Sequence, residues 1–146
     1  MQELLQRLSA TANLDEALAV VIEDFHAESG TIHLMGEDGQ LHLKAASKGI
    51  PPVVLDIVRV VPVGKGMAGL AAERAQPVTV CNLQTNTSGD ARPGAKATGM
   101  EGAIVVPMFV GERVAGTLGI ANRHERTFTE EETSALLAAG RLLAAR

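Results

Sequence analysis

Aromatic residues are almost missing from this 146-residue sequence, which has three phenylalanines and neither tyrosine nor tryptophan. A core must therefore be built from Ala, Val, Leu, Ile and Met, and a ligand pocket has few rings on which a flat molecule could stack. The Lys and Arg residues are scattered singly, and the net charge is −4. Because nucleic-acid binding draws most of its affinity from clustered cations, no nucleic-acid partner is expected.

Cysteine is equally scarce, since Cys81 is the only one. A single cysteine excludes an intramolecular disulfide and a cysteine-rich metal site. No apolar run approaches the roughly 18 residues of a membrane-crossing helix, and the amphipathic start of the chain is unlike a signal peptide. We therefore expect a cytoplasmic protein without a membrane partner. The length fits one domain over 1–146 that can bury a core.

Hydrophobic spacing predicts two helices at the start of the chain. The first covers 2–10, and the second begins after Asn13, which caps it with Glu16 in capping-box position. Gly30 is expected to end the second helix. The apolar residues of the first helix are Leu4, Leu5 and Leu8.

A last helix is predicted after Thr129, with Glu132 completing a capping box. Its apolar residues are Leu136, Leu137, Leu142 and Leu143. Together the first and last helices have more apolar residues than packing against one sheet requires. We expect the surplus to form a homodimer interface through the terminal helices, unless the two helices bury each other's apolar faces within one chain.

Alternation of apolar and polar residues predicts a first β-hairpin, with strands at 31–35 and 40–45 around the pair Asp38-Gly39. The side chains expected to face the core are Ile32, Leu34, Leu41 and Leu43. Those expected to face solvent are His33, His42 and Lys44. Two imidazoles could bind a metal, but no third ligand is evident, so no metal site is predicted.

A second hairpin is predicted at 103–110 and 113–121, around Gly111-Glu112 as a type II′ turn. The expected cross-strand pairs are Phe109 with Val114, Val105 with Leu118, and Ala103 with Ile120. Both faces of this hairpin are apolar or small, so layers should cover both. The predicted fold class is α+β, a central antiparallel sheet with the terminal helices on one face.

The middle of the chain must supply the other layer. A short helix is expected from Pro51 to Ile57, an extended segment over 58–63, a helix over 64–75 and a strand over 77–80. The segment 82–100 is rich in turn residues, and a loop of this length is usually functional.

Three segments, in this order, resemble a GAF domain. They are Val63–Gly69 with the following 71–78, then Gly99–Met100 with 104–120, and Phe128–Glu132 leading into Leu136-Leu137. The resemblance covers nearly the whole chain. It implies a sheet with terminal helices on one face and, on the other, a ligand cavity roofed by the 82–100 loop. It also implies a non-catalytic sensory or regulatory module that signals through its terminal helices.

The 82–100 loop combines length, glycine content and convergent polar groups, which favours a binding site. The residues expected near the ligand are Met67, Asp90, Arg92, Lys96 and Met100. Nothing in the sequence identifies the ligand or a cofactor.

Two other chemistries, dinucleotide binding and the reduction of methionine sulfoxide, fit the sequence less well. Gly64–Gly69 matches the dinucleotide fingerprint G-x-G-x-x-G. Antiparallel hairpins flank it and no acidic residue follows at the required distance, so a tight turn into a helix is favoured.

GAF-like enzymes that reduce free methionine sulfoxide work through several cysteines, whereas this chain has only Cys81, with no base beside it in sequence. We therefore predict no enzyme activity. A GAF fold that only dimerises, without a ligand, is the remaining alternative.

Overall fold

A six-stranded antiparallel sheet forms the centre of the computed structural model, which describes residues 2–81 and 99–145. The strands are β1 (Ser29–Met35), β2 (Gln40–Ala46), β3 (Val60–Pro62), β4 (Val78–Val80), β5 (Gly102–Val110) and β6 (Arg113–Asn122). The helices are α1 (Gln2–Ser9), α2 (Leu14–Asp24), α3 (Pro52–Val58), α4 (Gly66–Arg74) and α6 (Glu130–Ala144). The strand order is β3-β2-β1-β6-β5-β4.

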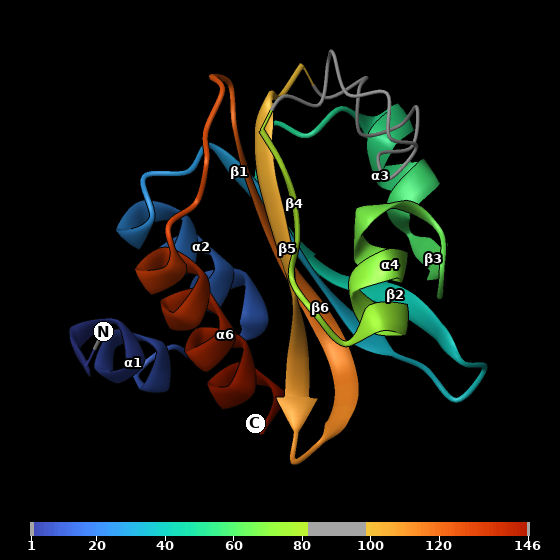
Figure 1. Ribbon diagram of the computed structural model, residues 1–146, viewed down its shortest axis with the longest axis horizontal. Coiled ribbons are helices and arrows are strands. Elements are labelled where there is room, and N and C mark those ends of the chain that lie inside the picture. The colour runs from blue at the N-terminus through green and yellow to red at the C-terminus, as the bar shows by residue number, and fades with distance from the viewer. Residues whose placement is uncertain (1, 82–98, 146) are drawn as a thin grey trace.

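Helices cover both faces of this sheet. Helices α1, α2 and α6 lie on one side, and α3 and α4 lie on the other (Figure 1). The α+β class and the placement of the terminal helices on one face are therefore confirmed. Within residues 2–81 and 99–145, no helix is both long and apolar enough to cross a membrane.

Side chains cap α2 and α6 as the sequence predicts. The Asn13 side chain accepts the N–H of Glu16, and the Glu16 carboxylate accepts the N–H of Ala12. At α6 the box is reciprocal, because Thr129 Oγ1 accepts the N–H of Glu132 while the Glu132 carboxylate accepts the N–H of Thr129. Both helices thus begin where a polar side chain satisfies backbone donors that have no intrahelical partner.

The prediction that Gly30 ends the second helix is wrong. Helix α2 ends at Asp24, the chain turns at His26 with a left-handed φ of 53°, and Gly30 lies inside β1 opposite Ile120. A Cβ atom at Gly30 would lie 2.7 Å from the carbonyl oxygen of Gly119. Glycine is therefore required here for the close approach of β1 to β6, and not for a helix end.

The second hairpin forms around Gly111-Glu112, but its register differs from the predicted one. Gly111 has a φ of 63°, and Phe109 pairs with Val114 as expected. A bulge then places one extra residue on β6, so that Met108 pairs with Gly116. The observed pairs beyond it are Pro107 with Thr117, Val106 with Leu118, Val105 with Gly119, Ile104 with Ile120 and Ala103 with Ala121. The predicted pairs Val105 with Leu118 and Ala103 with Ile120 are therefore wrong, because a one-residue shift changes which β5 side chains share a face with Leu118 and Ile120.

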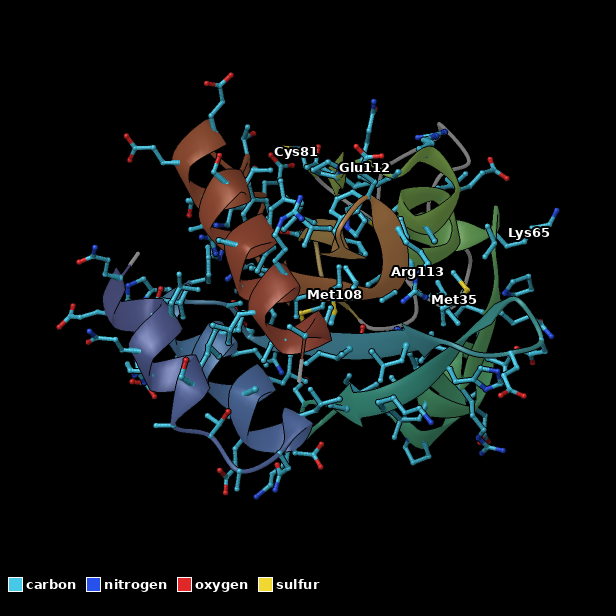
Figure 2. The ribbon with its side chains drawn as sticks, turned by 90° about the horizontal axis from the view of Figure 1, so that it is seen from below. Met35, Lys65, Cys81, Met108, Glu112 and Arg113 are labelled. Carbon is cyan, nitrogen blue, oxygen red and sulfur yellow. The ribbon has the colours of Figure 1, made fainter. Side chains whose placement is uncertain are left out.

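The bulge determines which side chains of β6 face the terminal helices. Leu118 and Ile120 pack with Ile104, Val106 and Met108 against the terminal helices. Figure 2 shows Met108 beside α6, where a Cβ atom on Gly140 would lie 3.0 Å from Met108 Cγ. Thr117, Gly119 and Ala121 of β6 face the opposite side.

The first hairpin also has a shifted register. Ile32 pairs with Ala45, but His33 pairs with Leu43, so a bulge on β2 separates the two pairs. Ile32 therefore faces the terminal helices, whereas Leu43 shares the opposite face with His33. The prediction that Ile32, Leu34, Leu41 and Leu43 share one face is wrong.

The terminal helices bury most of their leucines within the chain. The leucines of α1 and α6 that are at most 2% exposed are Leu4, Leu8, Leu136 and Leu143. Leu5, Leu137 and Leu142 are only partly buried. The apolar surplus that predicts a dimer is therefore much smaller than the sequence indicates, because α1 and α6 pack against each other.

Candidate functional site

A cavity of about 160 Å³ lies between the sheet and the layer of α3 and α4. Its floor comes from β1, β5 and β6, and its walls come from α3, β3 and the start of α4. The side chains that line it are mainly aliphatic. The cavity is thus on the face opposite the terminal helices, where the sequence predicts it. Among the described residues, Met100 is the contribution of the 82–100 segment to the lining.

The floor is low because its side chains are small. Ala103 and Ala121 face each other across β5 and β6, and Gly119 lies beside Val105. A Cβ atom on Gly119 would lie 3.1 Å from Val105 Cγ2 and 3.6 Å from Thr31 Oγ1. The bulge that turns Leu118 and Ile120 toward the helices therefore leaves space on this face.

The glycine-rich segment places Met67 over the cavity. Gly64 and Gly66 have φ values of 92° and 65°, which favour glycine, and the chain enters α4 directly after them. A Cβ atom on Gly69 would lie 2.3 Å from the carbonyl oxygen of Pro62, so α4 packs closely on the end of β3. The interpretation of this motif as a tight turn into a helix is confirmed.

Helix α3 forms another wall. Pro52 occupies its first turn, where the missing N–H costs no hydrogen bond. Val54 is buried toward the sheet, while Val53 on the outer face is 62% exposed. Val58, at the end of α3, lines the cavity. Its carbonyl oxygen accepts a hydrogen bond from His33 of β1, which joins the helix to the sheet.

His33 is the buried polar residue of the cavity. It is 2% exposed, and its Nε2 lies 2.8 Å from the carbonyl oxygen of Val58. Because a carbonyl can only accept, Nε2 must be protonated, and Nδ1 of the neutral ring is then an acceptor. Burial has the largest effect and lowers the pKa of His33, and the nearby His42 also lowers it. The hydrogen bond to Val58 raises the pKa, but the net change is a decrease. The prediction that His33 faces solvent is wrong: His33 lies on the face opposite Ile32, as alternation predicts, but α3 covers that face there.

His33 and His42 do not form a metal site together. His33 pairs with Leu43 and His42 pairs with Leu34, so the two rings lie on opposite faces of the sheet. His42 Nε2 instead lies 2.9 Å from Asp38 Oδ2, and this hydrogen bond is the main reason why the pKa of Asp38 is lowered. Over residues 2–81 and 99–145, no three His, Cys, Asp or Glu side chains cluster as a metal site would require.

Two of the five residues predicted at the ligand site line the cavity, and the other three lie outside the described residues. Met67 and Met100 line the cavity from α4 and from the segment before β5. Asp90, Arg92 and Lys96 lie outside the described residues. The structure adds lining residues that sequence reasoning missed, namely His33, Gly119 and Ala121. The alternation of small residues along β6 was the available signal for two of them.

Cys81 is exposed at the end of β4, and its Sγ lies 3.8 Å from Thr127 Oγ1. It is not among the described residues that line the cavity. Figure 2 shows it well separated from Lys65, which lies at the cavity. The thiol and the cavity are therefore separate features of the described structure.

Comparisons with known proteins agree with this architecture. A family model described as GAF domain matches residues 8–145. A GAF domain from an Acinetobacter phosphoenolpyruvate-protein phosphotransferase has a TM-score of 0.78 at 21% identity, covering 99% of this chain and 87% of that chain. The corresponding Coxiella burnetii domain has a TM-score of 0.78 at 23% identity, covering 99% and 88%.

Enzymes share the fold as well. A free methionine-R-sulfoxide reductase from Neisseria meningitidis, in complex with its substrate, has a TM-score of 0.79 at 21% identity, covering 99% of this chain and 83% of that chain. No curated protein matches the sequence. At these identities the solved structures establish the fold alone.

The buried neutral His33 predicts a dependence of stability on pH. With its pKa lowered in the folded chain, His33 takes up a proton on unfolding when the pH is below the ordinary value of 6.5. The free energy of unfolding should fall as the pH drops from 7.5 to 5.5, with a His33 contribution of at most about 1.4 kcal/mol per pH unit. Denaturant titrations should show a shallower decrease for His33→Gln.

His42→Gln is the matched control, because His42 is only half-buried and is paired with Asp38. It should retain more of the wild-type slope than His33→Gln. Equal slopes for the wild type and His33→Gln would contradict the assignment of a buried neutral imidazole.

Proposed function

The chain belongs to the GAF domain family, and we propose that it is a non-catalytic sensory module whose cavity binds a small molecule. The observation that supports this most directly is the cavity bounded by α3, α4 and four strands, with Gly119 and Ala121 in its floor. A dry apolar cavity of roughly 150 Å³ is large enough to bind benzene. The cavity here has about 160 Å³ and mainly aliphatic walls, so it suits a compact apolar ligand.

The position of the thiol supports a non-catalytic role. A cysteine nucleophile must meet its substrate and needs a nearby base that favours the thiolate. The described hydrogen-bonding contact of Cys81 Sγ is the hydroxyl of Thr127, and a hydroxyl is a poor base. An enzyme resembling the methionine sulfoxide reductases would also need a reductant to act on this one exposed thiol.

A polar network supports signalling from the cavity to the terminal helices. Ala121 belongs to the cavity floor, and the next residue, Asn122, is fully buried. Asn122 Nδ2 donates to the His26 carbonyl, and Arg126 donates to Asn122 Oδ1 at 2.7 Å and to the Glu132 carboxylate at 2.5 Å. A shift of β6 on ligand binding would therefore act directly on the first turn of α6.

A homodimer through the terminal helices is the corresponding assembly that we propose. Its surface would include the partly buried Leu5, Leu137 and Leu142. Light scattering tests it: Leu142→Glu should convert a dimer into a folded monomer, whereas Leu143→Glu should unfold the chain because Leu143 is 2% exposed. A wild-type chain that is monomeric at high micromolar concentration would exclude this dimer.

Filling the cavity should abolish ligand binding without unfolding the domain. Ala121→Leu adds three carbon atoms on the floor, opposite Ala103. Native mass spectrometry should detect any molecule that copurifies with the wild type, and an NMR titration with benzene should show saturable binding. Both signals should be lost in Ala121→Leu.

Ala19→Leu makes the same substitution at an exposed position of α2 and should bind like the wild type. Circular dichroism confirms that each variant is folded. A wild type that does not bind benzene, or binding that survives in folded Ala121→Leu, would rule out the cavity as the site.

An enzyme assay tests the non-catalytic assignment. Free methionine-R-sulfoxide and a thiol reductant should give no turnover above the rate without protein. The Neisseria meningitidis enzyme serves as positive control. Turnover that disappears in Cys81→Ser would instead establish a reductase and overturn the proposal.

A further inference from the structure

Two polar atoms on the cavity face have no hydrogen-bond partner among the described residues. They are Nδ1 of His33 and Oγ1 of Thr117, and both are buried. His33 and Thr117 lie directly opposite each other on β1 and β6, so their side chains are neighbours on one face of the sheet. Buried polar atoms are nearly always paired in native proteins, which makes this pair unusual.

The hydrogen-bonding character of each atom follows from its surroundings. The Val58 carbonyl holds the Nε2 proton of His33, so Nδ1 presents a lone pair and requires a donor. The Thr117 hydroxyl can donate and accept. A ligand group that satisfies His33 must therefore donate to Nδ1. A hydroxyl group does so.

We propose that the cavity ligand is a compact, uncharged, mainly apolar molecule whose hydroxyl group donates to Nδ1 of His33, the residue of the pair that lines the cavity. This inference rests on the proposed function and names the ligand class of the same site. Among the described lining residues Lys65 is the only one with a formal charge, and its side chain is exposed, so nothing described favours a charged group on the floor. A cavity near the benzene-binding size admits roughly seven to nine non-hydrogen atoms.

Phenol and toluene test this proposal, because they have nearly the same shape and differ in the hydroxyl group. Methyl resonances of Met67 and Met100, which line the cavity, report the Kd of each probe by NMR. The phenol preference is the Kd of toluene divided by the Kd of phenol. His33→Leu should lower this preference by about fivefold, the typical value of one hydrogen bond, whereas Thr117→Val should retain it, because Thr117 is not among the described residues that line the cavity.

Two control variants separate hydrogen bonding from packing. His33→Gln retains an acceptor oxygen and an amide that can donate to Val58, so it should retain the preference. Thr31→Val removes a hydroxyl of the cavity lining and should also retain it. A preference that is unchanged in His33→Leu overturns the proposal while leaving ligand binding intact. Failure of both probes to bind the wild type overturns the proposed function instead.

A measurement on the wild type keeps the proposal testable if His33→Leu does not fold. The ¹⁵N resonance of His33 Nδ1, assigned with His33→Gln, should move upfield on addition of phenol and should not move with toluene. An Nδ1 that already shows an accepted hydrogen bond without probe, and does not respond to phenol, has a buried water or the hydroxyl of Thr117 as its partner. That result would also overturn the proposal.

Discussion

The pairing of β5 with β6 through a bulge determines which side of the sheet is solid and which is hollow. One extra residue on β6 after Val114 turns Leu118 and Ile120 toward the terminal helices. The same shift turns Thr117, Gly119 and Ala121 toward α3 and α4. Without it the large side chains would fill the space now present above Gly119, and the helix layer would lose its core. The cavity is thus a consequence of the register in which β5 pairs with β6.

The two faces differ in what they contribute. On the helix side, residues such as Leu8, Leu18 and Leu136 are at most 2% exposed and make a dry core that holds the sheet rigid. On the other side, the floor has small residues, and its walls are the short elements α3 and β3. Short walls with few buried side chains have low local stability, which suits a site that opens to admit a ligand. His33 links wall to floor through the Val58 carbonyl.

Local signals in the sequence predicted the elements well. Asn13 and Thr129 mark helix starts, and Gly111 marks the second hairpin, because capping and turn chemistry depend on neighbouring residues alone. Facing could not be predicted the same way. A bulge depends on how two strands fit together, so the predicted β5 partners of Leu118 and Ile120 were wrong, and the helix that covers His33 could not be predicted from the alternation in β1.

The candidate site was predicted only in part for the same reason. Met67 and Met100, which were predicted because they flank a glycine turn and a long loop, line the cavity, and both of those signals are local. The burial of His33 was missed, because it depends on the end of α3, which packs over β1 from elsewhere in the chain. Three further residues, Asp90, Arg92 and Lys96, stay predictions.

The central claim is that the sheet face bearing Gly119 encloses a cavity that a small apolar molecule can enter. Xenon binds in dry apolar cavities of this size, and its electron density is unambiguous. A crystal of the protein pressurised with xenon should show a peak between Val54, Met67 and Gly119, which line the cavity. The same crystal form of Ala121→Leu should show a weaker peak or none. Side chains packed onto Gly119 in the wild type, with no xenon bound there, would contradict the account.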